Sequence, residues 1–265
     1  DIPYKNKIQA YLELSKYFSL KDFDKTVSLA DAGIQLAKQN ADSLSIAELA
    51  KTKGTAFYMK GNLDSAAGYF FKAIHFFETH NHRREAAAAY NELARLYRKT
   101  KDYKRAISFY DKAMRNYAFL QDTIGMATIY NESGVVYEEQ GNLEEAVRRY
   151  NVSLRLSEKV KDSVGISYAL SFLSEVFTIK KDFDNAIAYT MRSMQIRKLL
   201  KDSFATALSY SDLGAIYSQQ GQLDMAKESY TQSLQYALRL HYPDFIADNY
   251  LQLAGIAENQ NDYKA

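Results

Sequence analysis

The sequence has no cysteine. This absence excludes disulfides, thiolate metal sites and cysteine nucleophiles, and it fits a reducing or an oxidising compartment equally well. A strong excess of one charge is also missing, because 34 Lys and Arg residues stand against 32 Asp and Glu residues, for a formal net charge of +2. A nucleic-acid-binding segment usually has a basic stripe. Since none is present, we expect no nucleic-acid partner for this segment.

Long apolar runs are missing as well. No stretch approaches the roughly 18 to 20 apolar residues that span a bilayer, and no basic segment followed by an apolar one begins the chain. We therefore expect membrane contact only through parts of a parent chain that lie outside this sequence. Because the sequence begins with Asp1 rather than Met, we interpret it as a processed protein or an excised fragment.

Motifs of common enzyme classes are absent too. The chain has no His-Glu-x-x-His, Gly-x-x-x-x-Gly-Lys, Gly-x-Gly-x-x-Gly or Gly-x-Ser-x-Gly motif. His80 and His82 have no further His or Cys close in sequence, so we expect no metal site there. Glu138 and Glu139 point about 100 degrees apart on a helix and are interpreted as solvated surface. We predict that the chain is not an enzyme and uses no cofactor.

What the sequence does have is a short turn motif that recurs every 40 residues. Its copies begin at Lys21, Gly61, Lys101, Gly141, Lys181, Gly221 and Asn261. The first residue of the motif suits a helix end in the left-handed conformation. The polar residue after it suits the cap of the following helix. Each copy therefore predicts a junction between two helices.

Small and aromatic residues stand at fixed distances from these turns. Five residues after the turn starts, the chain has Thr26, Ala66, Ala106, Ala146, Ala186 and Ala226, and four residues later it has Phe70, Tyr110, Tyr150 and Tyr230. Before the turns, a large residue, a small one and an aromatic follow at spacings of four and three, as in Tyr90, Ala94 and Tyr97. These spacings place the residues on one helical face, which predicts a repeating core.

A second junction in each repeat is marked by an aspartate followed by Ser or Thr. The residues are Asp42, Asp122, Asp162 and Asp202, with His82 in one copy. A short side-chain oxygen at this position can accept the free backbone N–H groups of the next helix. We therefore predict two antiparallel helices per repeat, each of about 15 to 17 residues, joined by loops of about 3 to 5 residues.

This pattern resembles the tetratricopeptide repeat family. The family signature has an aromatic residue, Leu, a small residue and Tyr on the first helix, then Ala, an aromatic and Ala on the second. The resemblance covers essentially the whole chain, with three departures. Tyr occupies the usual Trp position, the proline that commonly ends the second helix is missing, and the period is 40 rather than about 34. The long-period branch of the family is the closer likeness.

The resemblance implies an all-α fold, a right-handed superhelical solenoid of helix hairpins with a concave inner wall. We expect residues 1–265 to form a single array of about six helical pairs, with turns at residues 21, 61, 101, 141, 181 and 221, plus a truncated seventh pair. Because the chain stops just after the turn at Asn261, we expect the parent protein to continue beyond Ala265.

The same resemblance implies a scaffold or sensory module that binds a protein or peptide. We interpret the chain as the excised repeat domain of a larger bacterial signalling regulator, a sensor histidine kinase or a helix-turn-helix regulator, in the periplasm or the cytoplasm. A stand-alone adaptor that recognises a linear motif stays an alternative. A regulator like the bacterial response-regulator phosphatases is more remote, because the repeats begin almost at Asp1 and those proteins have a separate N-terminal helical bundle.

Candidate binding residues lie on the first helix of each repeat, offset from the packing face, where the family points side chains into its groove. The predicted peptide-binding residues are Lys51, Asn91, Arg95, Arg98, Asn131, Glu138, Ser171, Glu175 and Ser211. Asn91 and Asn131 are equivalent positions one repeat apart, and their amides suit the backbone of an extended peptide, unless they are ordinary solvated polar residues.

Arg95 and Arg98 have two interpretations from sequence alone. Their planar guanidinium groups suit a ligand carboxylate. Alternatively, they form surface ion pairs with Glu92 or Asp102. The carboxylate clamp with which some family members bind the C-termini of heat-shock chaperones matches this sequence at Lys51 alone, so we do not expect that function.

Overall fold

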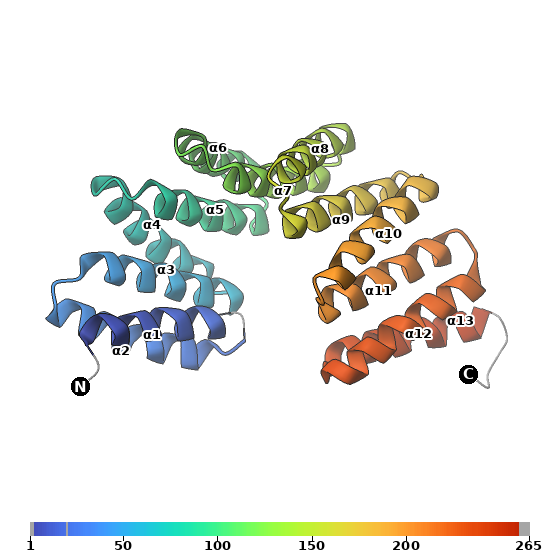
Figure 1. The fold of residues 1–265 in the computed structure, drawn as a ribbon, viewed down its shortest axis with the longest axis horizontal. Helices are drawn as coiled ribbons and strands as arrows, with labels where there is room; N and C mark the ends of the chain where they lie inside the picture. The colour runs from blue at the N-terminus through green and yellow to red at the C-terminus, as the bar shows by residue number, and fades with distance from the viewer. Residues whose placement is uncertain (1–2, 20, 260–265) are drawn as a thin grey trace. The chain divides into compact units, whose positions relative to one another are not determined.

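The computed structural model describes residues 3–19 and 21–259, and within these ranges the chain forms helices and turns but no strand. Thirteen helices follow one another in these ranges (Figure 1). They are α1 (Tyr4–Phe18), α2 (Phe23–Gln39), α3 (Ser43–Met59), α4 (Leu63–Thr79), α5 (Arg83–Lys99), α6 (Tyr103–Phe119), α7 (Thr123–Glu139), α8 (Leu143–Lys159), α9 (Ser163–Ile179), α10 (Phe183–Leu199), α11 (Ser203–Gln219), α12 (Leu223–Leu240) and α13 (Pro243–Asn259). The predicted all-α class is confirmed. None of these helices combines the length and the apolar character that a membrane span requires.

The chain divides into two compact units, residues 1–136 and 137–265, and the division falls within α7. In the first unit the five consecutive pairs from α1·α2 to α5·α6 pack together, α1 also contacts α3, and α3 contacts α5. The first helices of successive hairpins therefore lie side by side in this unit. In the second unit the helices from α8 to α13 likewise pack in sequence order. Each unit is thus a stack of helix hairpins, as expected of a solenoid.

The turn between α5 and α6 shows why the repeat keeps its residue pattern. Lys101 has φ of 60°, and its N–H donates to the Arg98 carbonyl at 2.8 Å while the N–H of Asp102 donates to the Tyr97 carbonyl at 2.9 Å. These two bonds close the end of α5. The Asp102 side chain then accepts the N–H of Arg105 at 3.1 Å, which caps α6. A few residues therefore end one helix and begin the next.

The same turn recurs along the chain. Left-handed residues occur at Ala41, Gly61, Asn81, Lys101, Gln121, Gly141, Lys161, Lys181, Lys201, Gly221 and His241. The predicted caps are confirmed at Asp42, Asp122 and Asp202. The prediction is wrong at Asp162, whose side chain makes no cap bond and instead lies in the space that a side chain at Gly165 would fill. The predicted turn at Asn261 lies outside the described residues, and the single array of residues 1–265 stays a prediction.

In the hairpins of α3 with α4 and of α11 with α12, a small residue on the first helix lies against an aromatic ring on the second. A Cβ atom added at Gly54 would lie 2.7 Å from the ring of Phe70, and one added at Gly214 would lie 2.9 Å from that of Tyr230. The aromatic side chains at these positions are buried, as are the alanines four residues before them. The predicted pairing of small and large residues is confirmed. In the hairpin of α9 and α10 the aromatic is replaced by Thr190, which hydrogen-bonds to Ser174.

Candidate functional site

Charged side chains from α5 and α7 meet on the first-helix face of the first unit. The Arg95 guanidinium lies 3.6 Å from the Glu92 carboxylate and 3.8 Å from the Glu132 carboxylate. The Tyr110 hydroxyl donates to Glu132 at 3.4 Å. Burial raises the pKa of Glu92, although Arg95 and Lys51 act in the opposite direction. Arg95 therefore forms ion pairs within the protein, which is the second of its two interpretations.

Lys51 on α3 has a different environment from Arg95. Its side chain is half-buried, and among the described residues its ammonium group has no hydrogen-bond or ion-pair partner. Burial lowers the pKa of Lys51, and the positive charge of Lys16 on α1 lowers it further, while Glu92 opposes the change. An incompletely compensated cation on this face is suited to an anionic group on a ligand.

The side-chain oxygens of Asn91 and Asn131 are buried and have no hydrogen-bond donor among the described residues. Asn131 is buried as a whole, with 7% of its surface exposed, and Asn91 is half-buried. Both lie on first helices, α5 and α7, at equivalent positions of consecutive repeats. A buried amide oxygen without a donor costs about 1–3 kcal/mol, so each of these two amides is stabilised by any further donor that reaches it.

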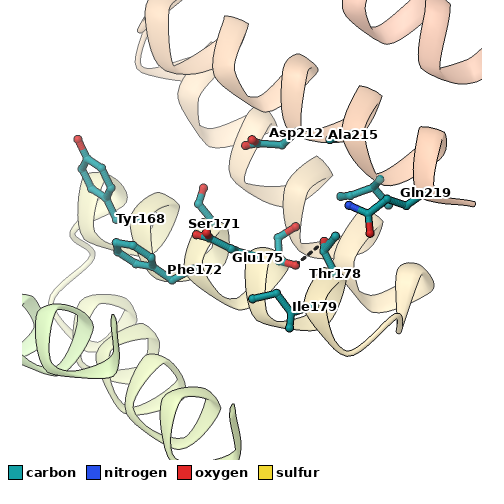
Figure 2. Close-up of a pocket in the computed structure, with 11 residues that line it drawn as sticks. Tyr168, Ser171, Phe172, Glu175, Thr178, Ile179, Asp212, Ala215 and Gln219 are labelled. Carbon is teal, nitrogen blue, oxygen red and sulfur yellow. Dashed lines mark hydrogen bonds between the residues drawn. The ribbon is translucent and has the colours of Figure 1, made fainter. Parts of the chain in front are cut away.

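A hollow of about 490 Å³ lies between α9 and α11 in the second unit (Figure 2). It is lined by Tyr168, Ser171, Phe172, Ser174, Glu175, Thr178 and Ile179 from α9 and by Asp212, Ala215, Ile216 and Gln219 from α11. Figure 2 shows the labelled α9 side chains along one wall and Asp212, Ala215 and Gln219 on the facing helix. The hollow, named here the α9/α11 hollow, is large enough to hold a side chain of a ligand.

Two carboxyl groups in the α9/α11 hollow have perturbed protonation. Burial raises the pKa of Glu175. Burial also raises the pKa of Asp212 to about 6, with a smaller contribution from Glu175 and an opposing one from Arg197. Water reaches both side chains, but the walls of the hollow displace part of the bulk solvent that would otherwise stabilise their charges. Neither carboxylate has an ion-pair or hydrogen-bond partner in residues 3–19 and 21–259.

Arg197 of α10 is buried behind this hollow, with 6% of its surface exposed. Its terminal nitrogens donate to the Ala205 carbonyl at 3.1 Å, the Ser209 hydroxyl at 2.7 Å and the Ser171 hydroxyl at 2.8 Å. The guanidinium therefore uses its donors on neutral oxygens rather than on the carboxylates of Glu175 and Asp212. Its burial lowers the pKa of Arg197.

The structure places the predicted binding residues in several environments. Ser171 and Glu175 line the α9/α11 hollow, and Ser211 precedes Asp212 without lining it. The Glu138 carboxylate accepts the Tyr150 hydroxyl at 2.6 Å, so it supports the core of α8. Arg98 lies on α5, where its guanidinium interacts with the Tyr110 hydroxyl. The role of these residues in ligand binding stays a prediction.

Among the residues of this site that the predicted set did not include are Tyr168, Phe172, Arg197 and Asp212. Two of them have a signature in the repeat. Acidic residues occupy the Asp212 position in three repeats, as Glu92, Glu132 and Asp212. The Arg197 position is occupied elsewhere by Ala37, Phe77, Tyr117, Ser157 and Ala237. A charged residue at a position that is otherwise small or aromatic indicates a buried polar site.

The histidines considered as metal ligands have other contacts. The His80 ring stacks on Phe76 with 4.1 Å between centroids, and its Nδ1 lies 3.0 Å from the Phe76 carbonyl. Across the portion of the chain that the structure describes, no group of three or more His, Cys, Asp or Glu side chains is arranged to hold a metal ion.

Comparison with solved structures shows the same fold. A signal transduction ATPase with numerous domains and a tetratricopeptide repeat sensor, from Pyrococcus horikoshii, has a TM-score of 0.71 and 17% identity, covering 96% of this chain and 41% of that one. A Rap protein in complex with competence and sporulation factor has a TM-score of 0.71 and 13% identity, covering 98% and 77%. NprR in complex with its cognate peptide NprX has a TM-score of 0.67 and 16% identity, covering 100% and 76%. At these identities the likeness establishes the fold alone.

Sequence comparison adds the family. No curated protein sequence matches the chain. The profile of the tetratricopeptide repeat matches residues 85–159 and 165–239, which together make up more than half of the chain. These ranges contain the small and aromatic core positions described above. On this match, with the helix hairpins that the structure shows, the chain belongs to the tetratricopeptide repeat family.

Proposed function

We propose that the chain is a peptide-binding module and that its ligand lies along the first helices α3, α5 and α7 of the first unit. The observation that supports this best is the pair of buried amide oxygens of Asn91 and Asn131, which have no donor within the described residues. Because less than 1 Å² of each oxygen is exposed, the two amides must rotate toward the ligand, after which backbone N–H groups of an extended peptide would supply the missing donors. Because the two amides stand at equivalent positions, one straight ligand can reach both.

The usual distance between packed helices suits an extended ligand. Packed helices lie about 8–10 Å apart, and an extended chain covers that distance with about three residues. A peptide running across α5 and α7 would therefore offer a backbone group to each amide at intervals of about three residues. Lys51 on α3, without an ion-pair partner, would bind an acidic side chain or the carboxyl terminus of the same peptide.

The similar structures support a sensory role. NprR was solved with its cognate peptide, and the Rap protein with competence and sporulation factor. In the ATPase from Pyrococcus horikoshii, a tetratricopeptide repeat sensor belongs to a much longer chain. We extend the proposal accordingly: this chain is the sensory module of a larger bacterial signalling regulator. The gene sequence beyond Ala265 tests this part, because a stand-alone adaptor would have no kinase or DNA-binding segment there.

Selection from a random peptide library displayed on phage, with the purified chain as bait, tests peptide binding directly. The affinity of each selected peptide is then measured by calorimetry for the wild type, the double variant Asn91→Ala and Asn131→Ala, and the control Asn116→Ala. Asn116 lies on α6, where its amide binds the Lys112 carbonyl at 3.0 Å. Loss of two hydrogen bonds should weaken binding about tenfold to a hundredfold, with no change for the control.

Two outcomes contradict the proposal. Peptides that bind the double variant as tightly as the wild type would show that the amides do not contact the ligand. Repeated selections that yield no binding peptide would remove the peptide-binding function itself. Circular dichroism of each variant establishes that a weaker affinity does not come from unfolding.

A further inference from the structure

The charges in the α9/α11 hollow differ from those elsewhere in the protein. Several acids elsewhere in the described chain form ion pairs, as Glu145 does with Arg149 at 3.1 Å and Glu158 with Arg192 at 2.6 Å. Glu175 and Asp212 have no such partner in the described part of the chain. With Arg197 behind them, the two ionised carboxylates leave one net negative charge in the hollow.

The walls of the hollow suit the apolar stem of a long cationic side chain. Phe172 is held in place by stacking on Tyr150, with ring centroids 5.1 Å apart and planes 13° apart. Tyr168 is 54% exposed, and its ring stands at one end of the row of α9 side chains (Figure 2). Aromatic faces attract cations, and apolar walls pack against the methylene groups of Arg or Lys. An anionic or purely apolar occupant would leave the carboxylates without a counter-charge.

We propose that the α9/α11 hollow binds an arginine side chain presented by a peptide, with Glu175 and Asp212 as the groups that accept its guanidinium and Tyr168 as an aromatic wall. The proposal rests on the peptide-binding function for the molecule that presents this arginine. Arginine fits better than lysine because a planar guanidinium can hydrogen-bond to two carboxylates and stack on an aromatic ring at the same time.

A small probe tests the hollow without any peptide. N-acetyl-arginine amide is titrated into isotope-labelled protein and followed by NMR, with N-acetyl-citrulline amide as the neutral molecule of the same shape. The arginine derivative should shift the resonances of α9 and α11 and bind about tenfold more tightly than the citrulline derivative. Equal binding of the two derivatives, or shifts that spare both helices, would overturn the proposal.

Two variants test whether the carboxylates of Glu175 and Asp212 bind the arginine derivative. Glu175→Gln and Asp212→Asn keep the side-chain shapes, and each should weaken binding of the arginine derivative about tenfold. Glu228→Gln removes an exposed acid on α12 and should leave the affinity unchanged. If Glu175→Gln and Asp212→Asn bind the derivative as the wild type does, the hollow is not its site. All three variants are first compared by circular dichroism.

The pH adds a second readout for Asp212. The groups that face it are Glu175 on α9, Arg197 on α10 and Tyr230 on α12. Because the carboxylate must be ionised to pair with arginine, the affinity should fall as the pH decreases from about 8 to about 5. An affinity that stays constant over this range would remove Asp212 from the site.

The tests of the two proposals have separate outcomes. The double variant of Asn91 and Asn131 should bind the arginine derivative as well as the wild type does, since both amides lie in the other unit. Peptides whose affinity depends on Asn91 and Asn131, together with an arginine derivative that does not bind in the hollow, would overturn only the inference about the hollow. An arginine derivative that binds in the hollow, with no peptide recovered from the libraries, would contradict only the peptide-binding function.

Discussion

Replacing Asp212 by Asn should make the protein more stable at neutral pH. Burial raises the pKa of the Asp212 carboxyl from 3.8 to about 6, although Arg197 acts in the opposite direction. A raised pKa means that the folded state binds the proton more tightly than the unfolded state, so the ionised carboxylate destabilises the fold. Asparagine keeps the shape of the side chain and removes this charge.

The magnitude follows from the size of the pKa change. About two pKa units would correspond to about 3 kcal/mol if the whole change acted on stability. Water reaches the Asp212 side chain, so solvent screening reduces the expected gain to about 1 kcal/mol. For a chain of this size that gain raises the unfolding midpoint by about 2–4 °C. The wild type loses the favourable contribution of neutral Asp212 as the pH rises through about 6, so the difference between the two proteins vanishes below about pH 4.

Thermal unfolding followed by far-UV circular dichroism, at several pH values, measures this difference. Glu228→Gln is the control, because it removes an exposed acid and should change stability by less than about 0.5 kcal/mol. An Asp212→Asn protein that is less stable than the wild type at neutral pH would refute the reasoning. Attraction to the buried Arg197 would then outweigh the effect of burial, and Asp212 would be a structural partner of that arginine. A gain that is the same at every pH would show that ionisation is not its cause.

Four further variants concern the helix hairpins, and urea unfolding measures the stability of each. Gly54→Val should lower stability by about 1–3 kcal/mol because its Cβ would lie 2.7 Å from the Phe70 ring, whereas Gly68→Ala, with no neighbour within 4 Å, should raise it by about 0.5–1 kcal/mol. Asp102→Ala should lower stability by about 1 kcal/mol through loss of the α6 cap, and an unchanged midpoint would show that the cap contributes nothing. Lys101→Gly should raise stability by about 1 kcal/mol because Lys101 has φ of 60°, and a decrease would contradict the assigned strain.

The helices and turns could be predicted from the sequence because interactions between residues close together in the chain determine them. Gly61, Lys101 and Gly141 each end a helix with a few backbone bonds to neighbours in the chain. Ala106 and Tyr110 recur at a fixed spacing in the repeat, so the burial of both side chains could be predicted from the periodicity. The predicted cap at Asp162 was wrong because a cap also depends on the direction in which the carboxylate points. The residue type alone does not determine that direction.

The site was predictable only in part. Ser171 and Glu175 were predicted from their positions on a first helix, and both line the α9/α11 hollow. Asp212 was missed because its environment depends on side chains of two other helices, Glu175 on α9 and Arg197 on α10. Arg197 was missed because a buried guanidinium needs three specific oxygen acceptors, and these become neighbours only when three helices pack together.

The uniform turns have a consequence for how such a chain changes over generations. Every helix end from Ala41 to His241 leaves in the same left-handed conformation, whichever residue stands there. A duplicated or deleted block of 40 residues would therefore rejoin through a connection that already exists, without a new loop. The number of hairpins is therefore free to vary while the connection between them stays the same.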